Sequence, residues 1–181
     1  MTITSRPLYV YLAASLLQTE YPGLFQTDRW SYPRLAEELR LAGAPVEDRI
    51  ELFGRMVFNA ICGNDDDHVR NHAIVYRAAE RRWRLAPAFD VVPNPVDTPV
   101  HLQMQLSLGR FDISREAVLA DAHRFGFGNA PDAAAYLDLL LERIKAGFPQ
   151  AAQALDHEWG QLMRDRLSWN VSILNGGGKP G

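Results

Sequence analysis

One amphipathic helix that ends in an acidic loop constrains the fold of this 181-residue chain more than any other feature. Between Pro45 and Gly63, apolar residues recur at the three- and four-residue spacing of one helix face: Ile50, Phe53, Val57 and Ile61. The pattern ends at Gly63-Asn64, a pair that favours a helix C-terminus. Polar residues follow without a break, in the order Asn64-Asp65-Asp66-Asp67-His68. The sequence therefore predicts a buried helix with an acidic loop at its end.

A short β-hairpin is expected directly after this loop. Residues 72–76 form a short run of β type, residues 77–82 a charged turn, and residues 83–85 a returning strand. The chain leaves the hairpin at Asp90. Residues 91–111 hold three prolines and are expected to form a long irregular connection, of the kind that is often functional in compact domains.

The remainder of the chain is expected to be helical. In residues 7–19, leucines at four-residue spacing predict a buried helix. Two further helices are expected to begin at serine caps. Ser31 caps a helix that ends at Gly43, and Ser114 caps a helix over residues 115–125.

Two C-terminal helices complete the prediction. One starts at Pro131 and ends near Lys145, and the other extends from about Gln150 to Leu174. The predicted fold class is mainly α with a small β-hairpin. We expect one domain over residues 1–174 and a flexible, Gly-rich tail over residues 175–181.

Composition excludes several classes of protein. Lys and Arg total 19 against 22 Asp and Glu, so the net charge of −3 and the pI near 5.9 argue against a strongly basic nucleic-acid binder, and no direct nucleic-acid contact is expected. The single cysteine, Cys62, excludes an intramolecular disulfide and suits a reducing compartment. The longest apolar stretch near the N-terminus, residues 8–17, is shorter than the roughly 20 residues of a membrane span and lacks signal-peptide flanks. A cytoplasmic location without membrane attachment is therefore expected.

The acidic loop has the composition of a cation site. Three adjacent carboxylates, at residues 65–67, repel one another, so a basic partner or a divalent cation is expected to offset them. Asn71 offers an amide oxygen five residues after Asp66, and Asp90 leaves a hairpin that could return beside the loop. Such oxygens suit Mg²⁺, which typically also binds substrate phosphates. Taken alone, however, an Asp-rich loop after a helix is more often a solvated turn.

The order of these residues is the order used in protein-kinase-like phosphotransfer. An Asp, then an Asn five residues later, then a hairpin and a second Asp correspond to Asp66, Asn71 and Asp90. In such sites the first Asp accepts the proton of the substrate hydroxyl, while the Asn and the later Asp hold Mg²⁺ on the nucleotide phosphates. The chemistry requires an oriented hydroxyl and neutralised phosphate charge within one short site.

Two segments resemble a known family of kinases. Residues 53–71 resemble the catalytic segment of HipA-type serine/threonine kinases, the toxins of bacterial HipBA toxin–antitoxin modules, and residues 83–93 resemble their metal-binding segment. The later stretches Leu106-Ser107-Leu108-Gly109 and Ile113-Ser114-Arg115-Glu116 resemble the same family. The resemblance implies the mainly helical C-terminal lobe of a protein-kinase-like fold.

The resemblance also implies a role for each matching residue. Asp66 corresponds to the catalytic base, His68 to a catalytic-loop residue that shapes the loop, and Asn71 and Asp90 to the ligands of Mg²⁺ and hence of ATP. Asp90 is followed by Val-Val-Pro where ordinary protein kinases have Phe-Gly, which fits the family. Arg70 stands where a Lys is usual, and Arg keeps the charge but changes the donor geometry.

The N-terminal lobe of the family has no counterpart in this sequence. Residues 1–50 contain no Gly-rich loop, and the first lysine of the chain is Lys145. The lobe could be a separate polypeptide, could have been lost from an inactive remnant, or could have been cut away from a longer protein. The partners implied are a protein serine or threonine substrate (glutamyl-tRNA synthetase is a known type of target), an N-lobe subunit and a HipB-like antitoxin.

Two other functions are compatible with the residues. A catalytically inactive remnant of a kinase lobe could bind a protein through its helical face. A metal-dependent hydrolase could use the Asp cluster and His68, although two-metal sites usually have more His or bridging carboxylates.

Overall fold

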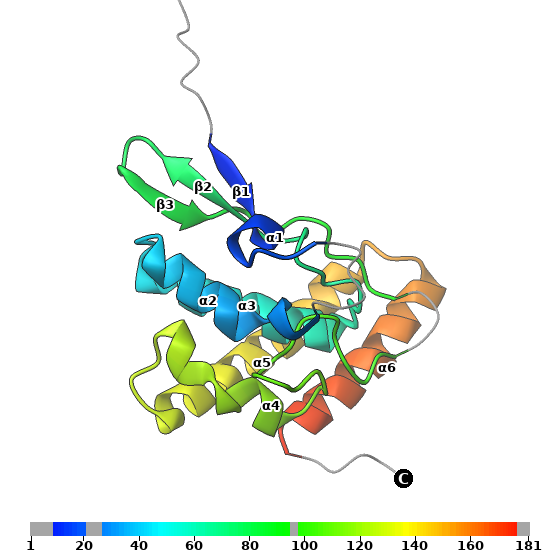
Figure 1. The fold of residues 1–181 in the computed structure, drawn as a ribbon. Coiled ribbons are helices and arrows are strands. Elements are labelled where there is room, and N and C mark those ends of the chain that lie inside the picture. The colour runs from blue at the N-terminus through cyan, green and yellow to red at the C-terminus, as the bar shows by residue number, and fades with distance from the viewer. Residues whose placement is uncertain (1–8, 21–26, 95–97, 177–181) are drawn as a thin grey trace, which may run out of the picture.

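The computed structural model describes residues 9–20, 27–94 and 98–176 (Figure 1). A small sheet stands at one end of a helical body. In chain order the elements are β1 (Val10–Leu12), α1 (Ala13–Leu16), η1 (Thr27–Arg29), α2 (Tyr32–Leu41), α3 (Val46–Cys62), β2 (Ala73–Arg77), β3 (Arg82–Leu85), α4 (Arg115–Ala120), η2 (Ala122–Phe125), α5 (Ala130–Ala152) and α6 (His157–Leu174). The predicted mainly helical fold class with a small β-hairpin is confirmed.

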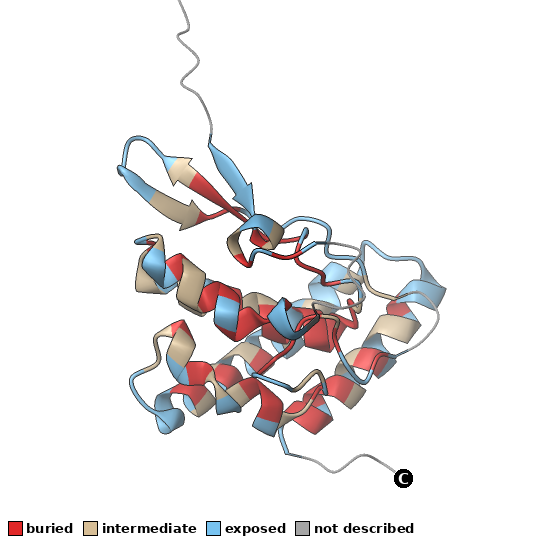
Figure 2. Ribbon diagram, viewed as in Figure 1, coloured by how far each residue is buried: buried red, intermediate tan, exposed pale blue. Residues whose placement is uncertain are grey.

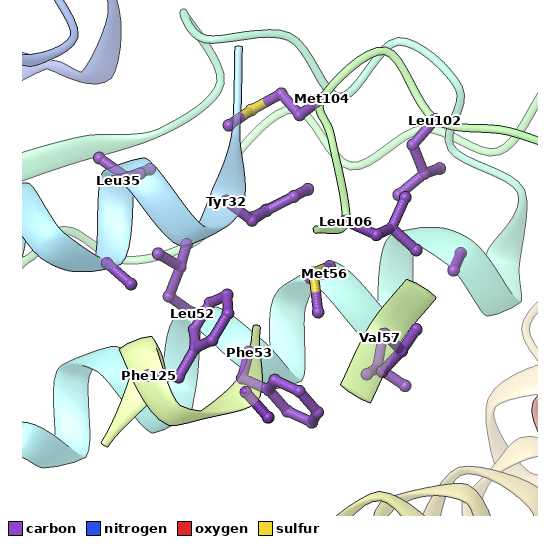
Figure 3. Packing of buried hydrophobic residues seen from close by; sticks show 14 of the residues in the cluster. Tyr32, Leu35, Leu52, Phe53, Met56, Val57, Leu102, Met104, Leu106 and Phe125 are labelled. Atoms are coloured by element: carbon purple, nitrogen blue, oxygen red, sulfur yellow. The ribbon is translucent and has the colours of Figure 1, made fainter. Parts of the chain in front are cut away.

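Helix α3 is the centre of the core. It begins after Pro45, with Glu47 and Asp48 in the first turn where they complement the helix dipole, and it ends at Gly63 in a left-handed conformation (φ +73°). It packs against α2, α5 and α6. Figure 3 shows Phe53, Met56 and other buried side chains of α3 meeting those of α2 and of the 102–106 segment.

Burial follows this arrangement. Figure 2 shows buried residues concentrated along α2 and α3, while the far end of the sheet is exposed or intermediate. Phe53 is fully buried and meets the rings of Phe125, Phe127 and Tyr136 edge to face. This aromatic cluster fixes α3 against the elements that follow the long connection.

The sheet is antiparallel in the order β1-β2-β3. Its inner end is tied to α3 by Asp48, whose Oδ2 accepts a hydrogen bond from the backbone N–H of Leu85 at 2.7 Å. The Arg84 guanidinium donates to the same carboxylate at 2.9 Å. Because the chain continues from β3 to Asp90, this anchor sets where that residue emerges.

The predicted helix over residues 7–19 is wrong in its first half. Residues 10–12 form the edge strand β1, with Val10 opposite Val75 and Leu12 opposite Ala73, and only residues 13–16 are helical. Leu8 lies outside the described residues, and Leu12 is 40% exposed rather than part of a buried helix face. Pairing with β2, more than 60 positions away in sequence, overrides the local helical spacing.

Other boundaries differ in detail. Ser114 caps α4 as expected, but the helix ends at residue 120 and a 3-10 turn continues to residue 125. Helix α5 continues to residue 152 through Pro149, and α6 starts only at residue 157, where Asp156 accepts a hydrogen bond from the N–H of Trp159. Phe148 of α5 and Met163 of α6 line the same apolar pocket as Phe58 of α3.

Two predictions concern the ends of the chain and the connection. Most of the predicted tail, residues 177–181, lies outside the described residues. Residues 91–94 and 98–111, the described part of the predicted long connection, contain no helix or named strand, as expected, and isolated bridges occur only in the second range. Among the helices that the structure describes, none is long and apolar enough to cross a membrane.

Candidate functional site

The acidic loop starts from a tightly bonded helix end. The backbone N–H groups of Gly63 and Asn64 both donate to the carbonyl oxygen of Asn59, at 3.0 Å each. Gly63 also has no room for a side chain, since a Cβ there would lie 2.7 Å from Cδ of Arg166. The loop therefore leaves α3 in one defined direction.

The three carboxylates of the loop diverge instead of sharing one ion. Asp65 Oδ2 accepts a hydrogen bond from Nδ2 of Asn94 at 2.9 Å, whereas the Asp66 side chain is 65% exposed. Asp67 is buried and points at the backbone of residues 103 and 104. Within the described part of the chain, no three His, Cys, Asp or Glu side chains gather as a metal site, so the acidic run and His68 do not form the cluster that the hydrolase alternative requires.

Asp67 anchors the loop to the core. Burial raises the pKa of Asp67 to about 7, and the backbone N–H of Gln103, at 2.7 Å, and the Tyr32 hydroxyl counteract part of this rise. Burial and the negative charge of Asp67 together hold the pKa of Tyr32 well above its ordinary value. The residue thus fixes the loop against α2 and the 102–105 segment and is not available to a substrate.

Asp66, His68 and Asn71, all predicted to be functional, come together in the loop. Oδ1 of Asp66 accepts a hydrogen bond from Nε2 of Gln103 at 3.2 Å, and Nε2 of His68 lies 3.7 Å from the same oxygen. Nδ2 of Asn71 donates to the backbone carbonyl of Asp66 at 2.8 Å. The backbone and carboxylate of Asp66 are therefore both held by hydrogen bonds, while the exposed carboxylate remains open to an approaching hydroxyl.

Asn71 and Asp90 line one small pocket. Since Nδ2 of Asn71 is bonded to the Asp66 carbonyl, Oδ1 is the atom of that amide that remains to bind a cation. Asn64, His72 and Arg55 line the same pocket, while Asp66 does not. The two predicted metal ligands thus line the same pocket, and Asn71 also contacts the backbone of the predicted base.

The backbone around Asp90 is strained and clamped. Asp90 has a left-handed conformation (φ +55°), which is uncommon for a residue other than glycine and is tolerated by Asp. Four residues later, the N–H of Asn94 donates to the carbonyl of Gly63 at 2.8 Å. Arg166 of α6 donates to the carbonyls of Asn94, at 2.7 Å, and Cys62, at 3.3 Å. These bonds hold the segment after Asp90 against the start of the acidic loop.

The donor set fits Mg²⁺ bound together with a nucleotide. It offers one carboxylate, from Asp90, and one amide oxygen, from Asn71. Mg²⁺ is usually bound by one or two carboxylates plus substrate phosphates, and it keeps several waters. A protein-only cage for a structural metal would need more ligands than these two residues supply.

Comparison with known proteins identifies the family. A family model described as the HipA-like C-terminal domain matches residues 10–155 of the chain. The chain belongs to the HipA-like C-terminal domain family. Among solved structures, this HipA-like domain is similar to a chain of the Shewanella oneidensis MR-1 toxin–antitoxin complex of HipA, HipB and operator DNA, with a TM-score of 0.73 and 16% sequence identity. No sequence match to a curated protein was found.

The comparison also shows how much of such a protein is present. The similarity covers 97% of the HipA-like domain but only 47% of the Shewanella chain, so the domain spans about half the length of that protein. The predicted family and its C-terminal position are confirmed. At 16% identity, the structural match establishes the fold and leaves the roles of individual residues to the geometry above.

Three residues of the site in the HipA-like domain were not found from the sequence. Gln103 positions the carboxylate of Asp66. Asn94 positions the start of the acidic loop, and Arg166 positions the segment after Asp90. Each lies at least 29 positions from its partner, and none belongs to a motif with recognisable spacing. The sequence offers one local signal, since Asn94 lies between two prolines.

Proposed function

We propose that this HipA-like domain is the catalytic lobe of a protein serine/threonine kinase that transfers phosphate from Mg·ATP to a protein hydroxyl. One observation supports this most strongly. The Asn71 amide is bonded to the backbone of Asp66 and also lines a pocket with Asp90, which supports a single site for the predicted base and both predicted metal ligands.

Each residue has a role that its surroundings support. The exposed Asp66 carboxylate accepts the proton of the substrate hydroxyl. Gln103 orients this carboxylate through a hydrogen bond from its side-chain amide. Asn71 Oδ1 and the Asp90 carboxylate hold Mg²⁺, which when bound neutralises the phosphate charge. His68, largely buried beside Asp66, shapes the loop rather than contacting substrate.

The activity of the whole protein requires a second lobe. Residues of both lobes contact the nucleotide phosphates in kinases. The domain, however, covers only 47% of the Shewanella HipA chain. We therefore expect an N-terminal half, on the same or another polypeptide, and weak ATP binding without it. A HipB-like antitoxin is the expected regulatory partner, as in the similar complex, and the substrate is a protein Ser or Thr in the cytoplasm.

The alternative is an inactive kinase lobe that only binds proteins. The two proposals differ in nucleotide binding, which calorimetry measures directly. We would titrate Mg·ATP into the domain combined with its N-terminal half, using wild type and Asp90→Ala. The kinase proposal predicts heat of binding that is lost in Asp90→Ala, because half of the protein ligand set is gone.

Absence of Mg²⁺-dependent binding in both proteins would support the inactive lobe. Asp138→Ala is a matched control, since Asp138 is an exposed carboxylate that pairs with Arg115, away from the pocket. It should bind Mg·ATP as the wild type does. Binding that is equal in wild type, Asp138→Ala and Asp90→Ala would contradict the assignment of Asp90.

A further inference from the structure

A buried amide oxygen in the pocket is not explained by the roles above. Asn64 is 1% exposed and lines the pocket of Asn71 and Asp90. Its Oδ1 is buried and accepts no hydrogen bond in the structure. An unsatisfied buried acceptor costs about 1–3 kcal/mol, so its presence needs a compensating reason.

A chain of hydrogen bonds fixes the orientation of this amide. Nδ2 of Asn64 donates to Oδ1 of Asn59 at 3.3 Å, and Nδ2 of Asn59 donates to the Tyr32 hydroxyl at 2.8 Å. The Tyr32 hydroxyl, having accepted that bond, directs its own proton to the Asp67 carboxylate, with which it interacts. Every donor in the chain therefore points towards Asp67.

The direction of the chain determines what lies at its other end. Because Asn64 uses its amide hydrogens towards Asn59, its oxygen must face away from that residue. The Asn64 oxygen at the end of this chain is therefore a buried acceptor that receives no hydrogen bond.

We propose that Asn64 is a positioning residue of the cation site, whose Oδ1 accepts a hydrogen bond from a water ligand of the Mg²⁺ held by Asn71 and Asp90. The inference rests on the proposed function, because it takes those two residues as the protein ligands. A water is favoured over direct coordination because Mg²⁺ gives up its waters reluctantly.

The role explains why three polar side chains are buried beside the pocket. Asn59 and Tyr32 are 3% and 0% exposed, and neither contacts Asp66, Asn71 or Asp90 by a hydrogen bond. Through Asn64 they connect the buried anchor Asp67 to the cation site. Partners outside the ligand shell of a metal typically change its affinity by about 10- to 100-fold.

Mn²⁺ binding in the presence of ATP, to the domain combined with its N-terminal half, tests the proposal without measuring activity. Mn²⁺ replaces Mg²⁺ and broadens the amide NMR signals of nearby residues, so a titration gives both the location and the apparent Kd. We would compare wild type with Asn64→Leu, which removes the acceptor, and Asn64→Asp, which retains an oxygen at Oδ1. Asn170→Leu is the control, because Asn170 is equally buried and donates to the carbonyls of residues 60 and 61 but does not line the pocket.

We expect Mn²⁺ to broaden the signals of Asn71 and Asp90 in the wild type. Asn64→Leu should raise the apparent Kd about 10-fold or more, while Asn64→Asp binds at least as tightly as wild type and Asn170→Leu is unchanged. Should Asn64→Leu lack a native spectrum, Tyr32→Phe takes its place, because it removes the hydroxyl that orients the Asn59 amide and leaves Asn59 and Asn64 present in the pocket. It should also weaken binding.

Other outcomes overturn the proposal in distinguishable ways. If Asp90→Ala abolishes Mn²⁺ binding but Asn64→Leu does not change it, the cation site stands and Asn64 has no part in it. If Asn64→Leu and Asn64→Asp weaken binding equally, Asn64 only supports the fold of the loop. If Asp90→Ala itself has no effect, the metal site of the proposed function fails together with this inference.

Discussion

At the scale of single residues, Asp67 and His72 lie five positions apart in the buried part of the loop. Their pKa values are shifted in opposite directions. Burial raises the pKa of Asp67 to about 7 and lowers the pKa of His72 to about 3. In the native state both are therefore favoured in their neutral forms near pH 5. The acidic loop owes its fixed position to groups that resist ionisation.

The two residues make opposite contributions to the pH dependence of stability. The native pKa of Asp67 exceeds its ordinary value of 3.8, so its contribution is complete below about pH 4 and is lost as the pH rises to about 7. The native pKa of His72 lies below its ordinary value of 6.5, so its contribution is complete above about pH 6.5 and is lost as the pH falls towards 3. Between pH 4 and pH 6.5 the two slopes oppose each other.

Removing either group should expose the slope of the other. Relative to wild type, we predict that the unfolding free energy of Asp67→Asn rises more steeply with pH between 4 and 6.5, and that of His72→Phe rises less steeply or falls. Urea denaturation at closely spaced pH values measures these slopes. Identical slopes in wild type and both variants would contradict the buried, neutral states of the two residues.

At the scale of elements, α3 supports both the core and the loop. Phe53 and Phe58 belong to the same helix, but Phe53 is fully buried in the aromatic cluster and Phe58 is 43% exposed. Phe53→Ala should lower the free energy of unfolding by about 3–5 kcal/mol through loss of burial and a cavity. Phe58→Ala, the matched control, should lower it by clearly less. Similar losses measured by denaturant unfolding would show that α3 is not packed as described.

The tight packing at the C-terminal end of α3 can be tested with two glycines that have similar φ angles. Gly43 and Gly63 both have left-handed φ angles, of +78° and +73°, but only Gly63 has close neighbours, at Arg166 and Pro99. Gly43→Ala should lower the free energy of unfolding by about 1–2 kcal/mol, the cost of a left-handed conformation alone. Gly63→Ala should lose clearly more, because the new methyl group displaces Arg166, and thermal unfolding measures the difference. Equal losses would indicate that the contact with Arg166 is not tight.

The elements that the sequence predicted correctly are those specified by neighbouring residues. The period and termination of α3, the Ser31 and Ser114 caps, and the hairpin after the acidic loop all depend on signals within a few positions. Strand β1 depends on β2, whose pairing partners are more than 60 positions away, so a helical pattern of leucines misled the prediction. Local spacing cannot report a partner that only the folded chain provides.

At the scale of the whole molecule, the site is made from segments that meet only in the fold. Motif spacing predicted Asp66, Asn71 and Asp90, and the structure brings Asn71 into contact with Asp66 and into one pocket with Asp90. Gln103 and Arg166, which hold these segments in place, lie 37 and 72 positions from the residues they bind. Their roles follow from long-range packing and have no signature in the sequence.

The contacts of Arg166 lead to a prediction about how the C-terminal helix is attached to the rest of the molecule. This buried arginine of α6 donates to the carbonyl of Asn94 and so ties the C-terminal helix to the segment after Asp90. Arg166→Met keeps much of the apolar volume but leaves that carbonyl without its donor. We expect a lower melting temperature and faster hydrogen exchange in residues 90–94, with little change in α2. Unchanged exchange in residues 90–94 would show that Arg166 does not hold the segment.

As the proposed base of a phosphotransfer site completed by Asn71 and Asp90, Asp66 should control the chemical step itself. The most direct measurement is the rate of phosphate transfer from Mg·ATP to a protein Ser or Thr, with the domain combined with its N-terminal half. Asp66→Asn leaves the pocket residues in place, so it should retain Mg·ATP binding while the transfer rate falls by about 10²- to 10⁴-fold. Equal transfer rates in wild type and Asp66→Asn, or no transfer by the wild type despite Mg·ATP binding, would contradict the account.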